Sequence, residues 1–116
     1  MKYLIILNDP PYGSERTYNG LRLADSLVKR EGVELKVFLI GDAVAAAHRG
    51  QKVPPGYYNA QNMLTMIVHR DRPIGVCGSC MDARGITESE LVEGTHRGSM
   101  EELTTWTVEA DKVITF

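Results

Sequence analysis

Residues 74–86 read IGVCGSCMDARGI, and they contain the strand-to-helix turn around which the fold is predicted to be built. The run from Ile74 to Cys77 contains no charged or strongly polar residue, which is typical of a strand buried on both faces of a parallel sheet. Gly78 permits a tight turn after this strand, and Gly85 is suited to end the short helix that follows. The stretch therefore predicts a buried strand that ends on a cysteine.

Other apolar runs predict the remaining strands of the same sheet. These strands are expected over residues 2–7, 34–40 and 112–116. A small fourth strand is expected at Leu91 and Val92. The sequence Thr95–Gly98 resembles residues 47–50 and is interpreted as the end of a helix or turn.

Apolar residues at helical spacing predict helices between the strands. They are expected over residues 14–31, 42–48, 59–70, 79–85 and 99–110. Short polar residues that can accept hydrogen bonds from free N–H groups mark their starts and one further helical turn. These residues are Ser14, Asp42, Asn59, Ser79, Thr87 and Ser99. The alternation predicts an α/β fold in which helices cover both faces of a mostly parallel sheet of about five strands.

Length and composition predict a single domain over residues 1–116. The net charge of -2 and the lack of a basic run give no indication of nucleic-acid binding. No apolar stretch approaches the roughly 20 residues of a membrane span, and the run before Asn8 is too short for a secretion signal. A disulfide between two cysteines three residues apart would close too small a loop to stabilise a secreted fold. The protein is therefore expected in the reducing cytoplasm.

The carboxyl ends of parallel strands meet at one edge of a sheet, where ligands and reactive groups gather. Cys77 is predicted to lie at this edge, together with the loops that follow the first two strands. We therefore expect a pocket formed by Asn8, Asp9, Tyr12, Gly41, Asp42, Gly78 and Ser79. Helix capping is a sufficient alternative explanation for Asp42.

Cys77 is the candidate reactive residue because it lies where a strand ends and a helix begins. Backbone N–H groups at a helix start stabilise a thiolate and lower its pKa from the free value of about 8.5. Cys80 is close enough in sequence to form a disulfide or to receive a sulfur atom. The simplest alternative is that both cysteines are small, buried packing residues.

A Cys-x-x-Cys pair also occurs in zinc sites, but a structural zinc ion needs four ligands, normally including a second close pair of Cys or His. His48, His69 and His96 are scattered along the chain. A zinc site is therefore not expected unless subunits share one. No other cofactor is expected, and the sequence places no histidine beside Cys77.

The chain resembles the DsrE family over nearly its whole length. The resemblance includes the first strand with its loop Asn8–Pro10, the segment Val37–Asp42 and the C-terminal segment Ala110–Val113. Its sharpest feature is a cysteine at the end of the third strand, followed eight positions later by the glycine of an Arg-Gly pair. This spacing selects Cys77, relative to Gly85, and not Cys80.

In sulfur-relay members of the DsrE family, the matching cysteine carries a persulfide that it receives from one protein thiol and passes to another. The resemblance also implies a three-layer α/β/α fold and assembly into homotrimers or hexamers. The Tyr57-Tyr58 loop and the helix containing Trp106 are the candidate contact surfaces.

The leading hypothesis is a small cytoplasmic sulfur carrier, or sulfurtransferase-like protein, that accepts a persulfide on Cys77 and passes the sulfur to a partner thiol. Its partners would be a sulfur-donor and a sulfur-acceptor protein, and Cys80 would assist by forming a disulfide with Cys77. The main alternative is a dithiol redox protein that uses both cysteines. The third is a non-catalytic oligomeric module that binds a small ligand at the strand ends.

Overall fold

The computed structural model describes residues 1–116. Its strands are β1 (Lys2–Leu7), β2 (Glu34–Leu39), β3 (Ile74–Cys77), β4 (Thr95–Gly98) and β5 (Lys112–Thr115). Its α-helices are α1 (Arg16–Val28), α2 (Ala60–Val68), α3 (Gly78–Asp82) and α4 (Met100–Glu109). Two 3-10 helices, η1 (Gly41–Ala47) and η2 (Glu88–Glu90), complete the chain.

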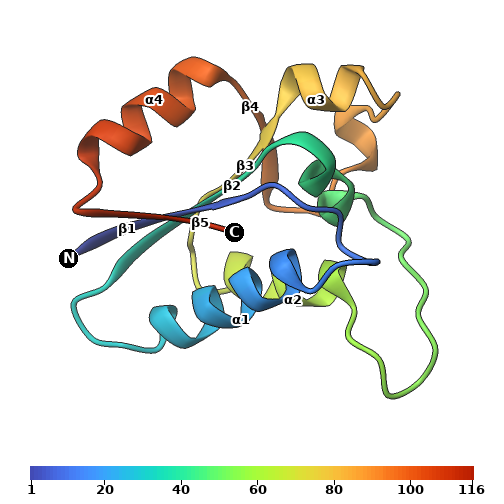
Figure 1. Ribbon diagram of the computed structural model, residues 1–116, viewed down its shortest axis with the longest axis horizontal. Helices are drawn as coiled ribbons and strands as arrows, with labels where there is room; N and C mark the ends of the chain where they lie inside the picture. Colours follow the sequence, from blue (N-terminus) through green and yellow to red (C-terminus); the bar gives the residue numbers. More distant parts are fainter.

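All five strands belong to one sheet in the order β4-β3-β2-β1-β5, and every neighbouring pair is parallel. Helices α1 and α2 lie on one face of the sheet, and α3 and α4 lie on the other (Figure 1). This arrangement confirms the predicted α/β fold with helices on both faces. None of the helices combines the length and apolar composition that crossing a membrane requires.

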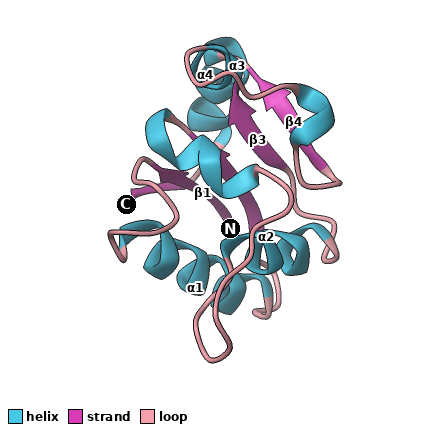
Figure 2. Ribbon diagram, turned by 90° about the vertical axis from the view of Figure 1, so that its right-hand side faces the viewer, coloured by secondary structure: helices cyan, strands magenta, loops and turns pink.

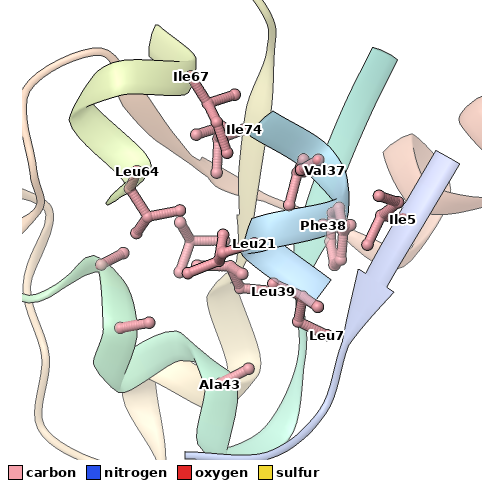
Figure 3. Packing of buried hydrophobic residues seen from close by; sticks show 14 of the residues in the cluster. Ile5, Leu7, Leu21, Val37, Phe38, Leu39, Ala43, Leu64, Ile67 and Ile74 are labelled. Carbon is pink, nitrogen blue, oxygen red and sulfur yellow. The ribbon is translucent and has the colours of Figure 1, made fainter. Parts of the chain in front are cut away.

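The core lies on both faces of the sheet, as β2 illustrates. Leu39 packs among Leu21 of α1 and Leu64 of α2 (Figure 3). The preceding residue, Phe38, points to the opposite face because side chains alternate along a strand. Its ring meets the Trp106 ring of α4 edge-on, with 6.0 Å between the ring centroids. Because both faces are covered, the strand sequence is continuously apolar.

The last residue of the chain holds the loop that follows β1. The main-chain N–H and the side-chain amide of Asn8 both donate to the Phe116 carbonyl, at 3.0 and 2.9 Å. The Phe116 ring packs on Gly20 of α1, where a Cβ atom would lie only 3.1 Å from the ring. Asn8 is thereby fixed at the carboxyl edge of the sheet, next to Gly41.

The fourth strand is formed by Thr95–Gly98, so both its expected position at Leu91 and Val92 and the interpretation of Thr95–Gly98 as a turn are wrong. Leu91 and Val92 are buried, but Leu91 forms only an isolated antiparallel bridge with His48. The sequence of β4 has no apolar pattern because this strand lies at the edge of the sheet, where none of its side chains is fully buried.

Two of the predicted caps have other roles. Helix α1 begins at Arg16 with Glu15, and not Ser14, in the cap position. The hydroxyl of Ser14 donates to the Asp9 carboxylate at 2.8 Å, while its oxygen still accepts the Arg16 N–H at 3.3 Å. Asp42 lies inside the 3-10 helix η1, and its carboxylate accepts hydrogen bonds from the Arg84 guanidinium instead of capping the helix. Ser14 thus binds a carboxylate in its own loop, and Asp42 binds a guanidinium that is distant in sequence. Such contacts compete with helix capping for a polar side chain.

A third predicted cap is displaced by one of the cysteines. Cys77 precedes α3 and occupies the cap position that was predicted for Ser79. The predicted caps Asn59, Thr87 and Ser99 are confirmed.

Helix α2 ends in a conformation that is unfavourable for its residue. Asp71 has φ of 57°, in the left-handed region where helices usually place glycine. We expect Asp71→Gly to raise the free energy of unfolding by ~0.5–1 kcal/mol, because it relieves the contact between Cβ and the backbone. Urea denaturation of the two proteins measures this difference. Asp71→Ala is the matched control and should give no gain, and a glycine variant less stable than wild type would contradict the interpretation.

Candidate functional site

Cys77 lies at the carboxyl end of β3, where the chain enters α3 (Figure 2). Its Sγ accepts a hydrogen bond from the Cys80 N–H at 3.4 Å and lies 3.4 Å from the Ser79 hydroxyl oxygen. The residue is only 5% exposed. Cys77 is therefore a largely covered thiol with several hydrogen-bond donors around its sulfur.

Two opposing effects act on the pKa of the Cys77 thiol. Burial raises this pKa, because a thiolate loses hydration when it is covered. Hydrogen bonds from Cys80 and Ser79 lower it, and together they outweigh burial, so the pKa lies below its ordinary value. The local structure therefore favours the thiolate form of Cys77, the form that acts as a nucleophile.

Cys80 has the opposite bias. Burial raises the pKa of its thiol, and the hydrogen bond with Cys77 raises it further. The Gly41 N–H, which donates to Cys80 Sγ at 3.2 Å, offsets only part of this increase. Gly41 has φ of 60°, a conformation that favours glycine, so this donor is placed by the backbone turn after β2. The pKa values of the two thiols are thus shifted in opposite directions, so the thiolate forms more readily at Cys77 than at Cys80.

Arg84 ties α3 to the turn that follows β2. Its Nη2 and Nε atoms donate to Asp42 Oδ1 at 2.6 and 3.1 Å, and its Nη1 donates to the Cys80 carbonyl at 3.0 Å. Asp42 thereby helps to hold the helix that contains Cys80.

Arg97 of β4 lies against the backbone beside Cys77. Its guanidinium donates two hydrogen bonds of 2.8 Å to the Asp82 carboxylate at the end of α3. A Cβ atom on Gly78 would lie 2.7 Å from Arg97 Nε, so the glycine leaves the space that the guanidinium occupies. The Asp82 carboxylate raises the pKa of Arg97, and the nearby Cys77 adds to this effect. The Arg97–Asp82 ion pair therefore lies beside the Gly78 backbone, next to Cys77.

The structure gathers five of the predicted pocket residues at this edge of the sheet. They are Asn8, Gly41, Asp42, Gly78 and Ser79. The other two have partners elsewhere: Asp9 accepts from Ser14, and the Tyr12 hydroxyl donates to Gln51 at 2.6 Å while its ring stacks on Tyr58. Asp9 and Tyr12 are thus part of the loop packing near α1 and α2.

Sequence reasoning did not identify Arg97 as a neighbour of Cys77. The reason is that Thr95–Gly98 was interpreted as a turn, so nothing placed it beside β3. No pattern within these four residues indicates a strand, and the pairing of Cys77 with Gly98 appears only in the folded sheet. Arg84 was noted only as part of the Arg-Gly pair.

No three His, Cys, Asp or Glu side chains converge in the way that a metal site requires. His48 pairs with Glu90 at 3.0 Å, and His96 pairs with Glu102 at 2.8 Å. These histidines therefore interact with carboxylates and not with the cysteines.

The model of the DsrE/DsrF-like family matches residues 1–116, which is the whole chain. The chain belongs to this family. Protein YchN from Escherichia coli (strain K12) is 45% identical to the chain over 116 residues, covering 99% of the chain and 98% of YchN. The crystal structure of ychN protein from E. coli matches with a TM-score of 0.94 and 44% identity, covering 100% of the chain and 99% of that structure.

A more distant relative is named as a sulfurtransferase. This protein, the Sulfurtransferase TusD homolog of Haemophilus influenzae, is 24% identical over 125 residues, which cover 99% of each chain.

The hydrogen bond from Ser79 makes a testable contribution to the pKa of Cys77. Ser79→Ala removes this donor, so the pKa of Cys77 should rise and the thiolate fraction near neutral pH should fall about two- to fivefold. The rate of Cys77 alkylation by iodoacetamide, followed against pH by peptide mass mapping, measures this change. The rates should converge at high pH, where the thiol is ionised in both proteins.

Ser26→Ala is the matched control because Ser26 is exposed on α1, and it should leave the profile unchanged. An identical alkylation profile for Ser79→Ala and wild type would show that Ser79 does not stabilise the thiolate.

Proposed function

We propose that the protein is a persulfide carrier of a sulfur relay, with Cys77 as the sulfur-accepting residue. The observation that carries the proposal is the environment of the Cys77 sulfur at the end of β3. It accepts a hydrogen bond from the Cys80 N–H at 3.4 Å and lies 3.4 Å from the Ser79 hydroxyl oxygen. These contacts lower the pKa of Cys77, whereas the pKa of Cys80 is raised. Membership of the DsrE/DsrF-like family supports the proposal, as does the similarity to a protein named as a sulfurtransferase.

The proposed transfer conserves atoms and electrons. The Cys77 thiolate attacks the terminal sulfur of a donor persulfide, R–S–SH, and the donor S–S bond breaks. The products are Cys77–S–SH and the donor thiolate, R–S⁻. An acceptor thiolate then attacks the same terminal sulfur and regenerates the Cys77 thiolate, so the complete cycle needs no external oxidant or reductant.

Cys80 has two roles in this proposal. As a protonated thiol it donates a hydrogen bond that stabilises the Cys77 thiolate before transfer. As a thiolate it attacks Cys77 Sγ of a loaded persulfide, which forms the Cys77–Cys80 disulfide and releases HS⁻. An external thiol must reduce this disulfide before the next cycle. The raised pKa of Cys80 slows this side reaction and so favours transfer to a partner.

Access to Cys77 limits the proposed reaction. Cys77 is 5% exposed, whereas Cys80 is only partly buried. Sulfur transfer through Cys77 therefore requires the α3 turn to move or a partner to open it. In this proposal the partners are a donor and an acceptor protein that present their own thiols, and the cycle operates in the reducing cytoplasm on a homotrimer or hexamer.

A dithiol redox cycle is the second candidate function. Two free cysteines that are neighbours in the α3 turn favour it, because the Cys80 N–H lies 3.4 Å from Cys77 Sγ and neighbouring free thiols are the requirement for a reversible disulfide. The two functions differ in what Cys80→Ser does. This variant abolishes a dithiol cycle, but it leaves a sulfur carrier able to be loaded.

Intact-mass spectrometry after incubation with glutathione persulfide tests the proposal. Wild type should gain the mass of one sulfur atom, and Cys77→Ser should not. Cys80→Ser should also be loaded and should hold the sulfur longer, because no neighbouring thiol can release it as sulfide. The two serine variants serve as matched controls for each other.

Two outcomes count against the proposal. One is a wild-type protein that gains no sulfur from the donor. The other is loading of Cys77→Ser to the wild-type level, which would make the more accessible Cys80 the acceptor.

A further inference from the structure

A cavity lies at the edge of the sheet opposite Cys77, near the start of β1 and β2. Its volume is about 200 Å³, and the end of α4 forms one wall. Figure 1 shows this region, where the end of α4 approaches the amino end of β1. The strands separate the cavity from the cysteines, so it is a different site.

Arg72 lines this cavity and has no partner for its charge. None of the ion pairs of the structure includes it. Its Nε atom is buried and makes no hydrogen bond. A buried donor without an acceptor destabilises the fold. A rotation of the Arg72 side chain that brought Nε to an acceptor in the cavity would relieve this cost.

The charges around the cavity favour a single negative charge. The lining contains three cations, Lys2, Lys36 and Arg72, and two carboxylates, Glu34 and Glu109. Lys36 and Glu109 neutralise each other through an ion pair of 3.2 Å. Within the lining, Glu34 is then the one carboxylate left for Lys2 and Arg72. The Asp111 carboxylate, outside the lining, accepts a hydrogen bond from the Lys2 main-chain N–H at 2.7 Å. A monoanion balances this set, whereas a dianion would be repelled more strongly by the two carboxylates.

The apolar part of the lining sets the size of the ligand. Tyr3, Leu35 and Trp106 of α4 give the cavity an apolar wall. The Lys36 ammonium lies over the Trp106 ring, 5.2 Å from its centroid, so the part of the wall beside Tyr3 and Leu35 is the one free of charge. A cavity of about 150 Å³ is large enough for benzene in a protein core. The space here therefore suits one six-membered ring with a small head group.

We propose that this cavity binds a small organic carboxylate, with the carboxylate on Arg72 and the ring against the part of the apolar wall beside Tyr3 and Leu35. Arg72 turns its guanidinium towards the cavity so that Nε and one Nη atom donate to the two carboxylate oxygens. The two parallel hydrogen bonds match the planar shape of the guanidinium. Because both partners are charged, these bonds are stronger than hydrogen bonds between neutral groups. Lys2 adds a second positive charge, and Lys36 stays with Glu109. The site does not depend on the sulfur chemistry proposed for Cys77.

Trp106 is the only tryptophan of the chain, so its fluorescence reports on the cavity. We expect cyclohexanecarboxylate to change Trp106 emission in a saturable way. The neutral analogue cyclohexanemethanol and inorganic phosphate should bind at least tenfold more weakly. Arg72→Gln should weaken carboxylate binding at least tenfold, and Arg72→Lys should weaken it less because it keeps the charge but loses the two parallel hydrogen bonds.

Arg70→Gln is the matched control, since Arg70 is exposed and does not line the cavity. Cys77→Ser should bind like wild type, which separates this proposal from the proposed function. Circular dichroism and thermal melting establish that each variant is folded. If Arg72→Gln is unfolded, the carboxylate affinities of Arg72→Lys and Arg70→Gln are compared instead. The proposal then requires weaker binding by Arg72→Lys than by Arg70→Gln.

Three results would overturn the proposal. They are no saturable signal with the carboxylate, equal binding of the neutral analogue, and wild-type affinity in both Arg72 variants. Preferential binding of inorganic phosphate would equally overturn it, because the proposal is specific for a monoanionic carboxylate.

Discussion

Parallel pairing of β2 with β3 determines what surrounds the two cysteines. Leu39 lies opposite Val76 in this pair, so both strands end at nearly the same level. The turn after β2 then meets the helix after β3, and the Gly41 N–H reaches Cys80 Sγ. Asp42 in the same turn holds Arg84 at the end of that helix. The register between two buried strands thus places groups that are distant in sequence around the Cys-x-x-Cys turn.

The consequence of this arrangement is a difference between two chemically identical side chains. Donors around Cys77 stabilise its negative charge, whereas burial and the neighbouring Cys77 keep Cys80 protonated. The ion pair of Arg97 with Asp82 lies beside Gly78, where the absence of a Cβ atom gives the guanidinium room. A nucleophile next to a protonated thiol is suited to accepting sulfur and retaining it, because the second thiol is slow to displace it as sulfide.

The sequence predicted the strands whose side chains are fully buried, but it did not predict the strand whose side chains are only partly buried. The continuously apolar strands were predictable because both faces of the sheet are covered, and Cys77 could be placed at the end of β3 for the same reason. The strand β4 lacked such a pattern, so Arg97 was missed. The roles of Ser14 and Asp42 were mistaken because a polar side chain near a helix start can equally bind a distant group, as Asp42 binds Arg84.

The central claim is that Cys77, and not Cys80, receives the sulfur. Isotopically labelled sulfur from a persulfide donor, located in wild-type protein by fragment-ion mass spectrometry of the peptide containing both cysteines, tests it most directly. The account predicts the label on fragments that contain Cys77 and exclude Cys80. Label found mainly on Cys80, or divided equally between the two cysteines, would contradict it.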